Sequence, residues 1–206
     1  VLNENNELVY KSQIPTDCSS AEKLIDDISE KCAEIMKEYY ISGIGIGTPG
    51  RIRGGKVNAV NIPFNDLDLK AAIEEKLNIP VKVSNDANCA ALGEAICGSG
   101  NAVKNLVMVS LGTGIGGGII INNKIYEGMG SAGEIGHFSL DMNGRECPCG
   151  MKGCFEQYAS AAALVSSAEA AAGHRAQRRA RNKVKKREPL FPAVPVFSWV
   201  FRAERV

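Results

Sequence analysis

Apolar residues recur along the first part of this chain with two different periods. Between residues 19 and 40 they fall three or four positions apart, which is the spacing of one buried face of a helix. Ser19 or Ser20 stands where the N-cap of that helix belongs. The next segment, ISGIGIGTPG, is a short apolar run that enters a glycine turn, as expected for a parallel strand that ends at a site.

The alternation of strands and helices continues to about residue 172 and predicts an α/β fold. Residues 1–15 resemble a strand or hairpin with a polar turn at Asn3–Asn6. The later pattern predicts a helix at 66–77, a buried strand at Val81–Ser84, and a loop at 85 that continues as a small-residue helix to 100. Strands at 107–111 and 118–125 are predicted on either side of a glycine loop and form a β-hairpin with an Asn122-Asn123 turn. An alanine-rich helix is predicted at 159–172.

Composition narrows the class of protein. The 206 residues suffice for one large domain or two small ones, and 45% hydrophobic with 23% charged residues is ordinary for a globular chain. A net charge of +1 gives the whole chain no bias toward nucleic acid or membrane. No apolar run reaches the roughly 18 residues of a membrane span, and no signal peptide opens the chain, so we expect a cytoplasmic protein without a membrane partner.

Residues 173–206 differ from the rest, since they hold ten Lys or Arg against two Glu. Such a block could be a nucleic-acid arm. The favoured interpretation is an atypical basic tail that is disordered or non-native, and nucleic-acid binding is not expected.

Cysteine usage gives the strongest chemical signal. Seven is an odd number, and three of the seven fall within eight residues, which does not suit a secreted disulfide framework. His137, Cys147, Cys149 and Cys154 together offer the imidazole and thiolate ligands that close a tetrahedral zinc site. Four protein ligands leave no open position, so the zinc is predicted to be structural. The alternative is three buried thiols and a histidine satisfied in the core.

Two further motifs are ambiguous by themselves. Asp86 directly follows a predicted strand, where it could act as a general base, or it could simply cap the helix that follows. The glycine loop from Gly112 to Gly118 could bring backbone N–H groups against a phosphate, or could be a tight hairpin. It lacks the Gly-Lys-Ser/Thr ending of a P-loop.

Taken together, the motifs resemble the ROK family of sugar kinases and sugar-responsive repressors, over about residues 1–170. The resemblance rests on GIGTPGRI, NIPFND, NDANCAALGE, SLGTGIGGGIIINNKIYEG, GSAGEIGH and CPCGMKGCFE, in that order. It implies the two-lobed actin/hexokinase-like ATPase fold (ribonuclease H-like), incomplete here, with the site in the cleft between the lobes. The implied division is an N-terminal lobe without its first strand at 1–95, part of a C-terminal lobe at 96–172, and the tail at 173–206.

The resemblance also implies a role for each site residue. Asp86 matches the base that deprotonates the sugar 6-hydroxyl for attack on the γ-phosphate of ATP. Gly112, Thr113 and Gly114 match a phosphate loop, and Mg²⁺ is expected to accompany ATP. Cys147, Cys149 and Cys154 with His137 match the zinc ligands. The residues that match the sugar-binding shell are Gly50, Asn61, Asn85, Asp86, Glu134, His137 and Glu156.

The expected function is therefore phosphorylation of a hexose at its 6-hydroxyl, with ATP as donor and glucose as the favoured sugar. N-acetylmannosamine, N-acetylglucosamine, fructose and allose are alternative substrates within the family. A sugar-responsive transcriptional regulator and a non-catalytic sugar-binding fragment are the alternative functions. The resemblance further suggests a homodimer.

Overall fold

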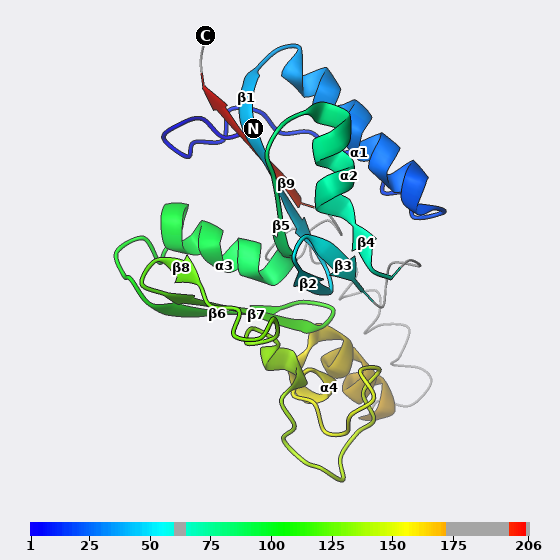
Figure 1. Ribbon diagram of the computed structural model, residues 1–206. Helices are drawn as coiled ribbons and strands as arrows, with labels where there is room; N and C mark the ends of the chain where they lie inside the picture. Colours follow the sequence, from blue (N-terminus) through cyan, green and yellow to red (C-terminus); the bar gives the residue numbers. More distant parts are fainter. Residues whose placement is uncertain (60–64, 172–197, 205–206) are drawn as a thin grey trace. The chain divides into compact units, whose positions relative to one another are not determined.

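A computed structural model describes residues 1–59, 65–171 and 198–204 (Figure 1). The chain divides into two compact units, one of residues 1–102 with 195–206 and one of residues 103–194. Asn61 lies outside the described residues, as do residue 172 and residues 173–197 and 205–206 of the basic tail. Among the helices in the described ranges, none combines the length and the apolar character needed to cross a membrane.

The sheet of the first unit is built on β1 (Tyr40–Thr48), the apolar strand that the sequence predicts. β5 (Val81–Asn85) runs parallel to it, in a register that pairs Thr48 with Asn85. β9 (Ser198–Glu204) pairs antiparallel with the other edge of β1, so the strand order is β5-β1-β9. β9 belongs to the segment for which disorder was expected, and its backbone forms a strand.

Isoleucine and glycine alternate along β1 and give its two faces different neighbours. Ile44 and Ile46 are buried in the main apolar cluster of this unit. Gly47 faces the other way, where an added Cβ would lie 3.4 Å from the Cβ of Cys89. Because side chains alternate across a strand, the isoleucine face builds the core and the glycine face lets a helix approach the backbone closely.

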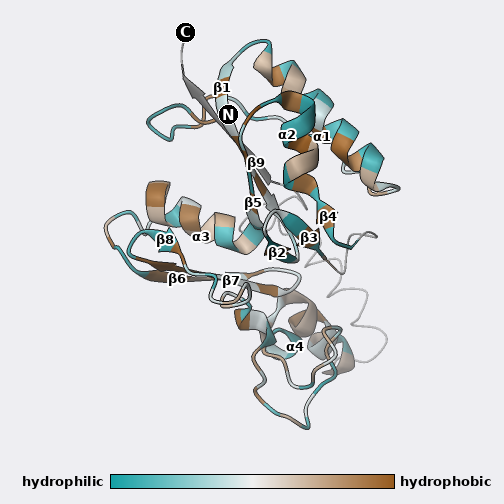
Figure 2. Ribbon diagram, in the orientation of Figure 1, coloured by the Kyte–Doolittle hydropathy of each residue, from teal (hydrophilic) through white to brown (hydrophobic). Residues whose placement is uncertain are grey.

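Two helices complete the core on the isoleucine side. α1 (Ala21–Met36) begins at Ser20, whose hydroxyl accepts the backbone N–H of Lys23 at 3.1 Å. α2 (Leu69–Leu77) ends at Asn78, which adopts a left-handed conformation with φ of 51°. The hydropathy colouring shows apolar and polar residues interleaved along both helices, as the helical period predicts (Figure 2). The buried side chains they add are Leu24, Ile28, Cys32, Ile35, Leu69 and Ile73.

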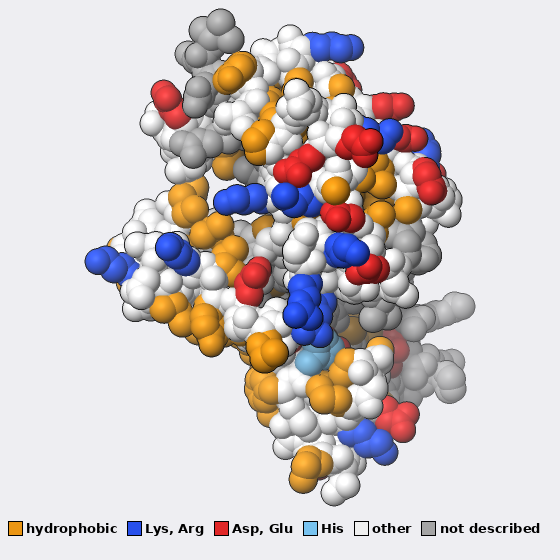
Figure 3. Space-filling model, viewed as in Figure 1, with side chains coloured by type: hydrophobic (Ala, Val, Ile, Leu, Met, Phe, Trp, Pro, Cys, Tyr) orange, Lys and Arg blue, Asp and Glu red, His pale blue; other side chains and the backbone are white. Residues whose placement is uncertain are grey.

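Short strands flank these helices. β2 (Arg51–Arg53), β3 (Lys56–Asn58) and β4 (Leu67–Asp68) form a small antiparallel sheet that the sequence pattern did not predict. The expected N-terminal hairpin is reduced to one bridge between Leu2 and Leu8. On the face shown in Figure 3, acidic and basic side chains are interspersed over this unit and form no patch of a single sign.

α3 (Asp86–Cys97) starts without the loop that the sequence analysis expected. Asn85 is the last residue of β5 and also the N-cap of α3. Its Oδ1 accepts the backbone N–H groups of Ala87 at 2.9 Å and Asn88 at 3.1 Å, so the strand passes directly into the helix.

The second unit contains an antiparallel sheet of β6 (Leu106–Leu111), β7 (Ile115–Ile121) and β8 (Lys124–Ile125). Asn122 and Asn123 form the predicted turn, with φ of 52° and 62°. The glycine loop is shorter than expected, because only Gly112–Gly114 form the turn and residues 115–118 lie in β7. Glycine is used in this strand because another backbone packs against it: a Cβ on Gly117 would lie 2.8 Å from the carbonyl oxygen of Gly133.

Three short helical segments complete this unit. η1 (Ile135–His137) packs against β7, and α4 (Glu156–Ala159) follows the last predicted zinc ligand. A further helix covers 161–171, within the predicted 159–172. Ser160 separates it from α4, since its backbone is extended and its hydroxyl accepts the N–H of Ala163 at 3.1 Å.

Candidate functional site

In the first unit, the predicted site residues gather where β1 and β5 end. Asn85 uses its Oδ1 to cap α3 and its Nδ2 to donate to the carbonyl of Gly50 at 3.2 Å. Asp86 is therefore the first residue of the helix and not its cap. Asp86 Oδ1 accepts the N–H of Ala87 at 2.8 Å, and Oδ2 makes no hydrogen bond within the described residues. The carboxyl ends of parallel strands are where α/β proteins place ligands.

Gly50 is required by this geometry. Its φ is +96°, and an added Cβ would lie 2.5 Å from both the Cβ of Ala59 and the carbonyl oxygen of Asn58. Any other residue would be strained in that conformation and would also overlap β3. The bond from Asn85 to Gly50 thus joins the turn after β1 to the start of α3.

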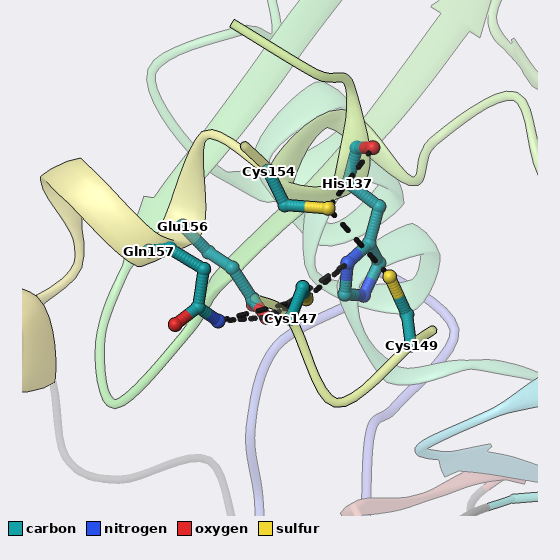
Figure 4. A network of polar contacts seen from close by, with 6 residues as sticks. All are labelled: His137, Cys147, Cys149, Cys154, Glu156 and Gln157. Carbon is teal, nitrogen blue, oxygen red and sulfur yellow. Dashed lines mark hydrogen bonds and ion pairs between the residues drawn. The ribbon is translucent and has the colours of Figure 1, made fainter. Parts of the chain in front are cut away.

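In the second unit, the four predicted metal ligands lie together. The ligand atoms of His137, Cys147, Cys149 and Cys154 are all within 4.8 Å of one another (Figure 4). Cys149 Sγ lies 3.6 Å from Cys154 Sγ, and Cys147 Sγ lies 3.7 Å from His137 Nδ1. None of the seven cysteines, all of which lie in the described ranges, is in a disulfide.

These separations match a tetrahedral ion. Bonds of about 2.3 Å to sulfur and about 2.0–2.1 Å to nitrogen place two sulfurs about 3.8 Å apart and a sulfur and a nitrogen about 3.6 Å apart. Two pairs of the cluster therefore stand at the separations of an ion with three thiolates and one imidazole, whereas the spread of up to 4.8 Å would have to close by about 1 Å around that ion. His137 would use Nδ1 as its ligand atom, because Nδ1 is the ring nitrogen beside Cys147.

Burial controls the protonation of the thiols. Desolvation raises the pKa of Cys147, and it raises the pKa of Cys154 to about 12. The backbone N–H of Met151 lowers the pKa of Cys149. In the metal-free protein the thiols of Cys147 and Cys154 therefore hold their protons at neutral pH, and a bound cation must displace them.

Two glycine contacts position this cluster. A Cβ on Gly136 would overlap the carbonyl oxygen of Ile115, so η1 can seat His137 against β7 only with glycine there. A Cβ on Gly114 would lie 2.9 Å from Glu156 Oε2, so the glycine turn lies directly beside the Glu156 carboxylate. Glu156 Oε1 lies 3.8 Å from His137 Nδ1. Glu156, which is predicted to bind sugar, thus lies beside both the Cys/His cluster and the predicted phosphate loop.

That phosphate loop is a tight turn. Gly112 N–H donates to the carbonyl of Gly114 at 2.9 Å, and the carbonyl of Gly112 accepts from Ala161 N–H at 2.9 Å. The N–H groups of Thr113 and Gly114 donate to no acceptor in the described part of the chain. They are available to an anion.

Glu134 and Gln157 differ from the expectation in opposite ways. Glu134 precedes η1, is exposed, and its carboxylate makes no hydrogen bond with the described residues. Gln157 was not predicted, yet its Nε2 lies 3.5 Å from Cys147 Sγ and 3.3 Å from Glu156 Oε1. Its position after Glu156 was the only signal in the sequence, and a lone glutamine carries no chemistry that would single it out.

Comparison with known proteins agrees with this arrangement. A xylose repressor of Bacillus subtilis (strain 168) is 44% identical over 148 residues, which are 70% of this chain and 38% of the repressor. A glucokinase of Halalkalibacterium halodurans is 41% identical over 175 residues, which are 80% of this chain and 53% of the enzyme. The chain thus spans about half or less of these curated relatives.

Solved structures show the fold. A ROK family glucokinase from Streptomyces griseus, in complex with glucose and AMPPNP, is 35% identical with a TM-score of 0.72, and the match covers 89% of this chain and 58% of that one. The predicted actin/hexokinase-like ATPase fold is confirmed, and the chain covers part of it. The sequence pattern of the ROK family matches residues 1–191, and the chain therefore belongs to the ROK family.

Proposed function

We propose that this chain carries the sugar site of an ATP-dependent hexose kinase that phosphorylates the 6-hydroxyl of glucose. The observation that carries the proposal is the state of Asp86. One carboxylate oxygen is fixed by Ala87 N–H, and the other accepts no hydrogen bond from residues 1–59, 65–171 or 198–204, at the end of a parallel strand pair. A carboxylate held in that way can accept the proton of a sugar hydroxyl as the oxygen attacks phosphorus. The glucokinase relatives support the reaction class.

The first unit would bind sugar beside this base. The Asn85 amide has two N–H groups, and one of them is used on Gly50. The second can donate to a sugar hydroxyl that Asp86 also contacts. Asn85 therefore has two roles in this proposal, one in holding the Gly50 turn and one in orienting the hexose.

The second unit holds further predicted acceptors for sugar hydroxyls and predicted donors for phosphate. With Nδ1 on the metal, His137 keeps Nε2 for a hydroxyl. Glu156 and Glu134 add carboxylates, and the N–H groups of Thr113 and Gly114 would bind a phosphate of ATP. Mg²⁺ bound with ATP would offset phosphate charge.

We assign zinc to the Cys/His cluster, because three thiolates and one imidazole favour it over hard cations. Its four ligands come from the protein, so no position remains for substrate. The residues around the zinc ion would hold His137 and Glu156 in place, whereas Asp86 would accept the proton of the sugar hydroxyl.

A second function is supported by one observation, the 44% identity to a xylose repressor. In that case the chain would bind a sugar and transfer no phosphate. A sugar-binding fragment without turnover gives the same biochemical result. The regulator and the sugar-binding fragment can be distinguished by whether sugar changes the binding of the protein to DNA.

The test is ADP release by the 206-residue chain with ATP, Mg²⁺ and a panel of hexoses, beside Asp86→Asn. Asparagine keeps an oxygen for Ala87 N–H but is no base, so sugar affinity should stay within about threefold while turnover falls by at least about 100-fold. Equal turnover in the variant would reject Asp86 as the base. No turnover in either protein, with sugar binding detected by calorimetry, would favour the sensor or the sugar-binding fragment over the kinase. The homodimer and the cytoplasmic location stay predictions.

A further inference from the structure

Gln157 connects the metal cluster to a sugar-binding carboxylate. It is the second residue of α4, and its side chain is half-buried. Figure 4 shows its amide nitrogen directed at Cys147 and Glu156 and its amide oxygen directed away from them. Nε2 lies 3.5 Å from Cys147 Sγ and 3.3 Å from Glu156 Oε1.

A bound cation would place two negative charges side by side next to Gln157, one on Cys147 and one on Glu156. Cys147 Sγ and Glu156 Oε1 are 3.4 Å apart. In the metal-free protein the thiol can donate to the carboxylate, but a thiolate bound to a cation has no proton to donate. The glutamine amide has two N–H groups, so it can donate one to each anion once the metal is bound. Hydrogen bonds to ionised acceptors are about twice as strong as neutral ones.

The backbone holds this side chain in place from both directions. The N–H of Gln157 donates to the carbonyl of Cys154 at 2.9 Å, and its carbonyl accepts from Arg145 Nη1 at 2.6 Å. Arg145 is itself fixed, since its guanidinium lies 4.8 Å from the ring centroid of Tyr158 and its backbone N–H donates to the Tyr158 hydroxyl at 2.9 Å. The amide of Gln157 therefore projects from an anchored position.

We propose that Gln157 is a positioning residue that couples metal binding to the orientation of Glu156. With the metal bound, its amide stabilises the Cys147 thiolate and holds the Glu156 carboxylate beside Gly114, ready for a sugar hydroxyl. The metal affinity and the sugar affinity then depend on the same side chain. The sugar half of this inference rests on the proposed function, whereas the metal half stands independently of it.

The test compares Gln157→Met, which keeps the length and removes the donor, with Gln157→Glu, which adds a third negative charge. Glu146→Gln is the control, because Glu146 lies on the same loop with its side chain 88% exposed. Zinc affinity is measured by competition with a chromophoric chelator. Cobalt(II) replaces zinc for spectroscopy, and glucose binding to the zinc-loaded protein is measured by calorimetry.

Gln157→Met should weaken zinc binding about 10-fold or more, the usual effect of losing a partner of a metal ligand. The thiolate-to-cobalt charge-transfer band should move to longer wavelength, because a metal-bound thiolate without a hydrogen bond is oxidised more readily. The d–d bands of tetrahedral cobalt should persist. The glucose dissociation constant should rise several-fold. Gln157→Glu should weaken zinc binding and glucose binding more than Gln157→Met does, and Glu146→Gln should match the wild type.

Zinc affinity within about twofold of wild type and an unmoved charge-transfer band would overturn the metal half. Weakened zinc binding with an unchanged glucose constant would overturn the coupling. A wild-type chain that binds no glucose would instead refute the proposed function, and the cobalt band and chelator competition would still decide the role of Gln157 at the metal.

Discussion

Gly136→Ala gives a sharp test of how the fold positions the metal cluster. Gly136 is buried in η1, and a Cβ there would overlap the carbonyl oxygen of Ile115. Ile115 cannot easily retreat, because it is paired with Leu111 across the β6–β7 ladder. The methyl group must therefore push η1 away from β7. Overpacking of this kind costs about 1–3 kcal/mol, and His137, the next residue, moves with the displaced backbone.

The matched control is Gly93→Ala. Gly93 lies inside α3, and an added Cβ there meets no atom within 4 Å. In a helix interior alanine is preferred over glycine by about 0.5–1 kcal/mol, so this variant should gain stability. Both changes add one methyl group. If stability falls in Gly136→Ala and rises in Gly93→Ala, the loss can be attributed to the contact with Ile115.

The assays are urea unfolding followed by circular dichroism, and chelator competition for zinc. Gly136→Ala should lower the unfolding midpoint and weaken zinc binding, while Gly93→Ala should raise the midpoint and leave zinc binding unchanged. If Gly136→Ala kept both the wild-type midpoint and the wild-type zinc affinity, the close approach of η1 to β7 would not be what holds His137.

Three further predictions concern single side chains. Cys149→Ser should lower the metal content from about one ion per chain and destabilise the fold, as elemental analysis and thermal unfolding would show; full metal content would remove Cys149 from the ligand set. Glu156→Ala should weaken sugar binding by about 1–3 kcal/mol, the value of a hydrogen bond to a charged group, and an unchanged calorimetric constant would exclude Glu156 from the sugar shell. Burial raises the pKa of Cys32 from 9.0 to about 12, so the thiol loses its proton at lower pH in the unfolded chain than in the folded one. The free energy of unfolding should therefore fall by about 1.4 kcal/mol per pH unit between about pH 9 and about pH 12. Cys32→Ala should lack that part of the slope in urea unfolding, and an identical slope in both proteins would disprove it.

The elements with a clear period were predictable from the sequence. α1, β1 and β5 lie close to their expected positions, because each shows one apolar face over enough residues to define its period. The turn at Asn122-Asn123 was predictable for a local reason, since asparagine tolerates positive φ. The family motifs also indicated the predicted zinc ligands, which are close in the sequence as well as in space.

Other features depend on contacts that no local pattern contains. The glycines at 116–118 resembled a loop in the sequence, but they form part of β7, against which η1 packs. The bond from the Asn85 side chain to the carbonyl of Gly50 joins residues 35 positions apart in the chain. Gln157 was overlooked for the same reason, since its importance comes from the two acceptors that the fold places beside it.

The segment between His137 and Cys154 has almost no apolar interior of its own. Leu140, Met142 and Met151 are exposed, whereas Cys147 and Cys154 are the buried non-glycine residues between positions 138 and 154. A bound ion would therefore stabilise this loop as a hydrophobic core stabilises a domain. It would act as a cross-link between the two ends of the loop and so reduce the conformational entropy of the loop. Chelation should then expose this loop to proteases and to hydrogen exchange while β6 and β7 remain protected, so that metal loss would appear as local melting well before the rest of the protein unfolds.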